Sequence, residues 1–200
     1  MKKLFRKLFS VDRIDLISKY FNSEDSSILE IGVHRGDFSR ELFDSFDPKK
    51  LVLVDPWIAF DDLEYNNSFY GNKNKDGQRI QNQYYQEVIS KFSKEAQSHK
   101  IEIIRDTSNN FFKVNNIKFD LIYIDGNHLY DFVKKDISNS LKFLKKNGVI
   151  VLDDYKLSGW WNDGVTEAVN YYKKNNKVNF LAKHDIFNYH HQCILSKKQN

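Results

Sequence analysis

The sequence contains a single cysteine, Cys193, in 200 residues. One thiol excludes an internal disulfide and a zinc site built from cysteines, so we expect a reducing, cytoplasmic location. No apolar run approaches the roughly 20 residues that cross a bilayer. The N-terminus is basic and amphipathic, and it lacks the unbroken apolar core of a signal peptide.

Motifs of several enzyme classes are also missing. The stretch ILEIGVHRGDFS has glycines at Gly32 and Gly36, but Val33 and His34 stand where the dinucleotide fingerprint G-x-G-x-x-G has its middle glycine. This disfavours a nicotinamide oxidoreductase. The turn also lacks the Lys-Ser/Thr pair of a phosphate loop, and no Cys or Ser nucleophile motif stands out.

The composition is that of a globular protein. Apolar residues make up 40% and aromatic residues 15% of the chain, so at this length one domain with a substantial core is expected. The net charge is +4 and the pI is near 8.9. Because charges of both signs are interspersed, this is weak evidence for a nucleic-acid partner, and we expect none.

From residue 28 onward, strand-like and helix-like runs alternate. This pattern predicts a parallel sheet with helices on both faces, closed by two strand-like runs that suggest an antiparallel hairpin. The predicted strands are residues 27–32, 51–55, 101–106, 119–125, 148–154, 178–184 and 191–197, and the predicted helices are 36–46, 80–96, 108–114, 129–146 and 164–175.

The chain is divided into an N-terminal amphipathic helical segment, residues 1–27, and one domain, residues 28–200. The segment places Leu4, Phe5, Leu8 and Phe9 on one helical face among basic residues. Two interpretations stay open: packing on the domain or on a second subunit, which would make a homodimer, or weak attachment to an anionic membrane surface. Residues 57–78 form one long irregular stretch, which is interpreted as a mobile loop over the site or a surface insertion.

Acidic side chains follow the predicted strands. Because ligands of open α/β sheets bind beyond the carboxyl ends of the strands, these acids indicate a ligand with hydroxyls, a positive charge or a metal ion. They are Glu30, Asp55, Asp106, Asp125, Asp153 and Asp154.

Three of these acids suit a metal. Asp125 ends the fourth predicted strand, and Asp153 and Asp154 end the fifth. Neighbouring parallel strands lie about 5 Å apart, so the three carboxylates can surround a hard divalent cation such as Mg²⁺ or Mn²⁺. A structural role in a loop is the alternative for Asp153 and Asp154. His128 could accept a proton beside that cation, or it could be a structural histidine.

The first glycine turn and the next two strand ends suit a nucleoside. Helix N-termini bind anionic groups through free N–H groups, and Ser39 adds a hydroxyl. Asp55 lies about 20 residues beyond the turn, where an acid accepts hydrogen bonds from a ribose diol, although it could be a turn residue before Pro56. Asp106 precedes Thr107 and Ser108; it could accept from an adenine amino group or cap a helix.

The motifs LEIGVHRGDFS, LVLVDPW, FDLIYIDGNHLYDFVKKDI and LKKNGVIVLDDY, followed by GVTEAV, together resemble the class I S-adenosylmethionine-dependent methyltransferases. Within them the chain is most similar to the small metal-dependent O-methyltransferases of the catechol type and the macrocin type. The resemblance extends from residue 28 to about 170. It implies a Rossmann-like, doubly wound, seven-stranded sheet of order 3-2-1-4-5-7-6, with strand 7 antiparallel.

The resemblance also implies roles for the residues above. The methionine part of the cofactor would be held by Glu30, Gly32, Gly36 and Ser39, the ribose by Asp55, and the adenine by residues from Asp106 to Ser108. Asp125, Asp153 and Asp154 would bind Mg²⁺, and His128 would take the proton of the acceptor hydroxyl.

We therefore predict an Mg²⁺-dependent O-methyltransferase that acts on a small polyhydroxylated substrate, such as a sugar or nucleotide-linked sugar of a surface glycan or secondary metabolite. Methylation of RNA or protein is the second interpretation, although the N/D-P-P-Y/F motif for exocyclic amines is absent. A non-catalytic protein that binds S-adenosylmethionine is the third, and the complete set of acids argues against it.

Overall fold

A computed structural model describes residues 13–22, 24–60, 76–157, 161–186 and 190–198. Residues 1–12 and 23 of the N-terminal segment and residues 61–75 of the irregular stretch at 57–78 lie outside these residues. Among the described residues, no helix has both the length and the apolar character needed to cross a membrane.

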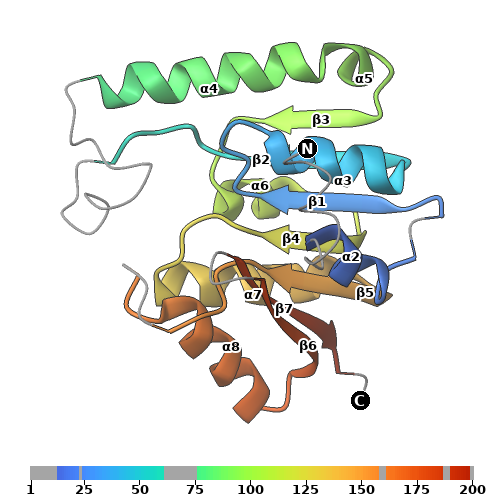
Figure 1. Cartoon of the computed structure of the whole chain (residues 1–200), viewed down its shortest axis with the longest axis vertical. Helices are drawn as coiled ribbons and strands as arrows, with labels where there is room; N and C mark the ends of the chain where they lie inside the picture. The colour runs from blue at the N-terminus through green and yellow to red at the C-terminus, as the bar shows by residue number, and fades with distance from the viewer. Residues whose placement is uncertain (1–12, 23, 61–75, 158–160, 187–189, 199–200) are drawn as a thin grey trace, which may run out of the picture.

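The fold is one seven-stranded sheet with helices on both faces (Figure 1). The strands are β1 (Ser27–Ile31), β2 (Lys50–Val54), β3 (Ile101–Ile104), β4 (Phe119–Ile124), β5 (Leu144–Leu152), β6 (Val178–Ile186) and β7 (His190–Lys197). The helices are α2 (Arg13–Ser18), α3 (Asp37–Phe46), α4 (Gly77–Lys91), α5 (Ser93–Gln97), α6 (Ser108–Val114), α7 (Tyr130–Phe143) and α8 (Gly164–Lys174).

The strand order is β3-β2-β1-β4-β5-β7-β6. Strands β1 to β5 pair in parallel, and β7 is antiparallel to both β5 and β6. The predicted topology, including the closing hairpin, is confirmed.

The strands are apolar on both sides because helices cover both faces. On one face, Leu29 and Ile122 pack in a core that includes Phe112 of α6, Val133 of α7 and Val169 of α8. On the other face, Leu53 and Tyr123 pack in a second core that includes Ile17 of α2, Leu42 of α3 and Val88 of α4. Glu30 is buried on this second face, because it alternates with Leu29 and Ile31 along β1.

Two predicted helices differ from the structure. The helix predicted for 80–96 begins at Gly77 and is divided at Phe92 into α4 and α5. The helix predicted for 129–146 ends at Phe143, and β5 begins at Leu144. Leu144 has extended dihedral angles and pairs with Phe119, with a register shift before the next pair, Leu121 with Val149. Gly148 therefore lies inside β5, where a Cβ would come within 2.9 Å of the Asp120 carbonyl oxygen.

Candidate active site

The carboxyl ends of the parallel strands form the candidate site. The backbone N–H of Asp125 donates to Ile31 at 2.8 Å, and that of Asp153 donates to Ile124 at 3.0 Å. These bonds extend the strand pairing by one residue, so both acids lie directly at the sheet edge.

The glycine turn after β1 brings two chain segments unusually close. Gly32 has φ of 87°, and a Cβ on it would lie 2.1 Å from the Asp125 carbonyl oxygen. Only glycine fits such an approach in this conformation. Gly36 has φ of 71° and is the N-cap of α3. The turn therefore fixes β1 against the loop that carries Asp125.

Asp55 holds this turn through its side chain. Its Oδ2 accepts hydrogen bonds from the backbone N–H groups of Val33 (2.9 Å) and His34 (3.0 Å), and its Oδ1 accepts from Trp57 (2.7 Å). The side chain is buried, but it still lines the pocket described next. Asp55 thus orders the loops after β1 and β2.

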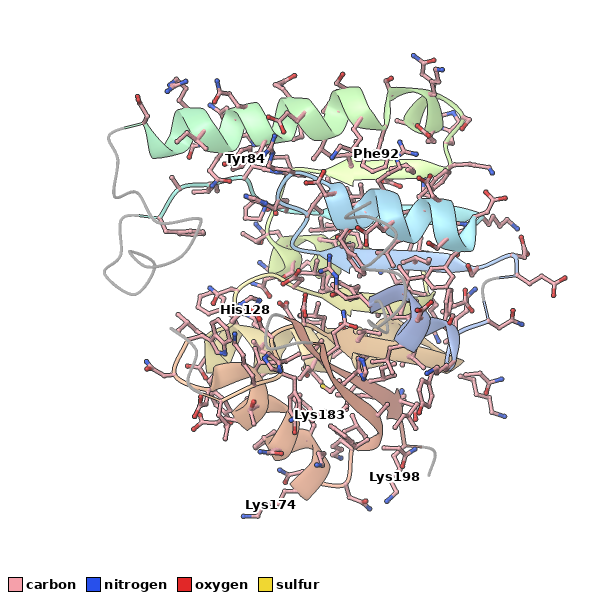
Figure 2. All side chains as sticks on the ribbon, in the orientation of Figure 1. Tyr84, Phe92, His128, Lys174, Lys183 and Lys198 are labelled. Atoms are coloured by element: carbon pink, nitrogen blue, oxygen red, sulfur yellow. The ribbon has the colours of Figure 1, made fainter. Side chains whose placement is uncertain are left out.

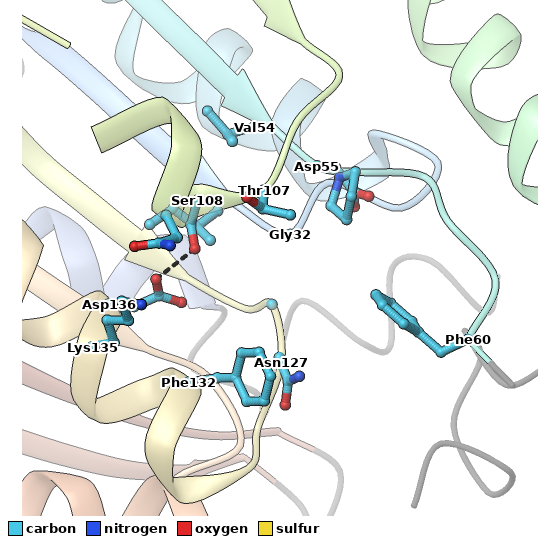
Figure 3. A pocket seen from close by; sticks show the side chains of 14 residues that line it. Gly32, Val54, Asp55, Phe60, Thr107, Ser108, Asn127, Phe132, Lys135 and Asp136 are labelled. Carbon is cyan, nitrogen blue, oxygen red and sulfur yellow. Dashed lines mark hydrogen bonds between the residues drawn. The ribbon is translucent and has the colours of Figure 1, made fainter. Parts of the chain in front are cut away.

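A pocket of about 270 Å³ opens between the ends of β1, β2 and β4 and the loop after β3 (Figure 3). Its polar groups include the side chains of Asp55, Thr107, Ser108 and Asp136, and its apolar groups include Ile31, Val54 and Phe132. This size is close to the lower end of the ~300–1,000 Å³ typical of small-molecule sites.

Four of the predicted cofactor residues line this pocket, namely Gly32, Asp55, Thr107 and Ser108. The other four, Glu30, Gly36, Ser39 and Asp106, are not among the lining residues. Asp106 accepts hydrogen bonds from the backbone N–H of Thr107 (2.7 Å) and the side chain of Asn110 (3.0 Å). The N-cap of α6 is Thr107, not Asp106.

Glu30 is a buried acid under α3. Burial raises its pKa to about 8, although the hydroxyl of Ser39 lowers it. The raised pKa favours the neutral form of the carboxyl at pH 7. A cationic group brought close to it would favour the charged form.

Asp136 and Phe132 of α7 also line the pocket, and sequence reasoning did not single them out. Asp136 is buried and accepts a 2.6 Å hydrogen bond from the hydroxyl of Ser108. Burial raises the pKa of Asp136 to about 6. The signal in the sequence was an acid on the apolar stripe of a helix, between Val133 and Ile137.

Asp125, His128 and Asp154 form a compact group next to the pocket (Figure 2 labels His128). Potential ligand atoms of the three side chains all lie within 4.8 Å of one another. His128 Nε2 lies 3.3 Å from Asp125 Oδ1, and His128 Nδ1 lies 3.2 Å from Asp154 Oδ2. Asn127, between Asp125 and His128 in the chain, lines the pocket, so group and pocket are contiguous.

Charges in this group act on each other. Burial and the charge of Asp153 raise the pKa of Asp125, while His128 lowers it. The pKa of His128 is raised, because the two acids outweigh the opposing effect of burial. Trp161 is buried and packs edge-on against His128, with ring centroids 5.1 Å apart.

Asp153 is not part of this group, although its charge acts on Asp125. Its Oδ2 lies 3.2 Å from Nη1 of Arg13 and accepts a 3.0 Å hydrogen bond from the hydroxyl of Tyr123. Its Oδ1 accepts the backbone N–H of Asp154 at 3.0 Å. Arg13 had no signal in the sequence, since it comes from the N-terminal segment and meets Asp153 only through the fold.

A family described as a methyltransferase domain matches residues 29–155. The chain belongs to this methyltransferase family. The match covers the strands, turns and acids that build the site.

The chain is also similar to individual proteins. Uncharacterized protein R132 of Acanthamoeba polyphaga mimivirus is 26% identical over 160 residues; the match covers 78% of this chain and 63% of that relative, so the chain spans less than two thirds of its length. A solved candidate rRNA methylase from Clostridium thermocellum has a TM-score of 0.64 at 13% identity, covering 92% of this chain and 93% of that one. Podospora anserina methyltransferase PaMTH1, solved with SAH (S-adenosylhomocysteine) bound, has a TM-score of 0.61 at 16% identity, covering 92% and 76%. At these identities the solved structures show a shared fold.

The pocket suits the cofactor of such enzymes. S-adenosylmethionine combines a flat apolar base with a polar ribose and a charged amino-acid end. The pocket offers apolar side chains beside hydroxyls and carboxylates, and glycine backbone at Gly32 and Gly126. The carboxylates of Asp125 and Asp154 likewise suit a hard divalent cation, because Mg²⁺ and Mn²⁺ prefer oxygen ligands, and His128 lies beside them.

Proposed function

We propose that the protein is an S-adenosylmethionine-dependent, Mg²⁺-dependent O-methyltransferase that acts on a hydroxyl of a small polyhydroxylated substrate. The observation that supports it most is the convergence of Asp125, His128 and Asp154 within 4.8 Å beside the pocket. A pocket for the methyl donor and a group for hydroxyl activation are the two parts that such a reaction needs.

The cation would be held by Asp125 and Asp154, joined by Asp153 after a change of side-chain partners. Mg²⁺ and Mn²⁺ both accept such an oxygen-rich set. The methyl donor would be held by Gly32, Asp55, Thr107 and Ser108, which line the pocket.

When bound, S-adenosylmethionine supplies the methyl group and the cation lowers the pKa of the acceptor hydroxyl. His128 accepts the hydroxyl proton on a ring nitrogen. Asp125 and Asp154 raise the basicity of His128, and Trp161 fixes its ring by edge-on packing. Much of the rate gain would come from holding the two reactants in line.

The substrate class rests on the chemistry of the acids. Carboxylates accept hydrogen bonds from hydroxyls, and a cation between them binds neighbouring oxygens of a diol. A sugar, free or nucleotide-linked, fits this description. The alternatives are methylation of RNA, methylation of protein, and binding of S-adenosylmethionine without catalysis. A panel of acceptors separates them.

The contacts of His128 and Arg13 with the acids favour a second candidate function, which is methyl transfer without a metal. His128 lies between Asp125 and Asp154, and Arg13 lies on Asp153. Arg13 can offset the charge of Asp153 without an added cation, so His128 does not have to be protonated to balance the acids. His128 would then be the sole proton acceptor.

The test has a binding arm and an activity arm. S-adenosylhomocysteine is titrated calorimetrically into the wild type and Asp154→Asn, and methyl transfer to sugars, nucleotide-linked sugars, RNA and protein is measured with Mg²⁺ and with a chelator. Asp131→Asn is the matched control, since Asp131 is an exposed acid on the neighbouring helix α7. We expect micromolar binding to all three proteins, and transfer to a sugar hydroxyl that the chelator and Asp154→Asn abolish.

The outcomes separate the parts of the proposal. If S-adenosylhomocysteine does not bind, the proposal of S-adenosylmethionine-dependent methyl transfer is wrong. Binding with transfer that persists in the chelator would favour the metal-free candidate. Transfer only to RNA or protein would overturn the substrate class.

A further inference from the structure

Arg13 brings a positive charge from the N-terminal segment to the candidate active site. It is the first residue of α2, and its guanidinium lies 3.9 Å above the ring of Phe38 in α3 and 3.2 Å from Asp153. Its side chain is only 17% exposed. The contact with Phe38 is a cation–π interaction. Together with the ion pair to Asp153, it fixes the position of the Arg13 side chain on the face of the sheet that α3 covers.

Asp153 is fully engaged in this arrangement. Arg13 and Tyr123 both contact its Oδ2, and the backbone of Asp154 donates to its Oδ1. The hydroxyl of Tyr123 in turn accepts a 2.6 Å hydrogen bond from Gln192. The compact group of potential metal ligands contains Asp125 and Asp154 but not Asp153.

Electrostatics explains why Asp153 needs a cation. Its side chain is 7% exposed, and Asp125 and Asp154 lie at the same sheet edge. A buried carboxylate among other carboxylates is costly unless a positive group pairs with it. Arg13 supplies that charge, and a divalent cation between the three acids would supply it equally well.

We propose that Arg13 and the divalent cation compete for Asp153. This inference rests on the metal-dependent form of the proposed function. Arg13 acts as a positioning residue: it keeps Asp153 paired with its guanidinium, outside the group of Asp125, His128 and Asp154, until a cation takes its place.

The exchange requires little movement of the backbone. Leu16 and Ile17 of α2 and the following Phe21 are buried in the core and can stay in place. Arg13 lies at the first turn of the helix, and the Phe38 ring remains beneath it. Glu41 of α3 is one of the acids whose charge acts on Arg13 and offers an alternative partner.

The first test measures Mn²⁺ affinity by electron paramagnetic resonance, without any turnover. We expect Arg13→Gln to bind Mn²⁺ about tenfold more tightly than the wild type, and Arg13→Lys to resemble the wild type. Arg40→Gln is the matched control, because Arg40 is also part-buried, pairs with Glu95 at 2.9 Å and lies over the ring of Phe92. Its Mn²⁺ affinity should be unchanged.

A double variant separates competition from a general effect of charge. If Arg13 acts through Asp153, Arg13→Gln gives no gain when Asp153→Asn is already present. If Arg13 only repels the cation through space, the gain persists in that background, and the competition is overturned. Unchanged or weaker affinity in Arg13→Gln overturns it as well.

A second measurement follows the wild type itself, and a variant serves only to assign one signal. Adding Mg²⁺ to ¹⁵N-labelled protein should shift the Nε–H signal of Arg13, assigned by its loss in Arg13→Lys, and leave that of Arg40 in place. An Arg13 signal that stays unchanged at saturating Mg²⁺ contradicts the exchange. If S-adenosylhomocysteine binds but Mn²⁺ does not, the metal-dependent form fails together with the competition, while the methyltransferase reading stands.

Discussion

The hydroxyl of Ser108 donates a 2.6 Å hydrogen bond to the buried carboxyl of Asp136. This bond joins the start of α6, which follows β3, to helix α7, and both residues line the pocket (Figure 3). Burial raises the pKa of Asp136 from 3.8 to about 6. A carboxyl that is easier to protonate in the folded state makes stability depend on pH.

The sign follows from the two pKa values. The stabilisation by protonated Asp136 is fully present below about pH 4 and is lost as the pH rises through about 6. Asp136→Asn should remove this dependence, because an amide carries no charge and its oxygen can still accept from Ser108. Two pKa units correspond to about 2–3 kcal/mol, so at pH 7 the variant should be more stable than the wild type by up to that amount.

Urea denaturation between pH 4 and pH 8 checks this prediction. The difference in free energy of unfolding between the two proteins should grow from near zero to its full value over that interval. The control is Asp131→Asn, an exposed acid on the same helix. A variant that is less stable than the wild type at pH 7 would show that Asp136 makes stabilising contacts in its charged form.

Gly32 and Gly126 give a matched pair for the glycine turn. A Cβ on Gly32 would overlap the Asp125 carbonyl oxygen at 2.1 Å, with φ of 87°, whereas on Gly126 the nearest atom is Ile31 Cγ2 at 3.4 Å. Gly32→Ala should lower the free energy of unfolding by more than about 3 kcal/mol or prevent folding. Gly126→Ala should change it by less than about 1 kcal/mol. Thermal and chemical denaturation of both variants measure this difference. Equal losses of stability in the two variants would contradict the close approach of Gly32 to the Asp125 carbonyl oxygen.

The sequence predicted the sheet well because its strands are short apolar runs bounded by acids and glycines. It failed at Leu144, since the stretch LKFLKKNG has the spacing of a helix, and only pairing with Phe119 makes it a strand. Tertiary pairing overrides local pattern at such places.

For the candidate site, the sequence indicates the positions of the acids but not the partners of those acids. The position of an acid after a strand can be read from the chain, so Asp55, Asp125 and Asp154 were expected at the strand ends, where the structure has them. The partner of each carboxylate cannot be read in this way. Arg13 lies 140 residues from Asp153, and the contacts of Asp55 are to backbone groups, which leave no mark in the sequence.

Asp55 should therefore affect stability as well as binding. Its carboxylate accepts three backbone N–H groups, from Val33, His34 and Trp57, and hydrogen bonds to a charged group contribute about 1.5–3 kcal/mol each. Because water can replace some of them, Asp55→Ala should cost about 2–4 kcal/mol and also weaken binding of S-adenosylhomocysteine. Asp55→Asn should recover part of this, since its oxygen can serve Val33 and His34 while its NH₂ faces Trp57. A loss of binding in Asp55→Ala with unchanged stability would instead assign the residue to the ribose alone.

Phe132 should affect binding without affecting stability. Phe132 is 51% exposed yet lines the pocket, so the fold itself leaves about half of its area uncovered. Contact with a bound nucleoside would bury that area, and aromatic contacts add about 0.5–1.5 kcal/mol beyond area burial. Phe132→Ala should weaken S-adenosylhomocysteine binding roughly tenfold in calorimetry and shift the free energy of unfolding by less than about 1 kcal/mol. Val114→Ala, an exposed apolar residue outside the pocket, is the control and should change neither. Wild-type affinity in Phe132→Ala would mean that the base lies elsewhere along the pocket, away from α7.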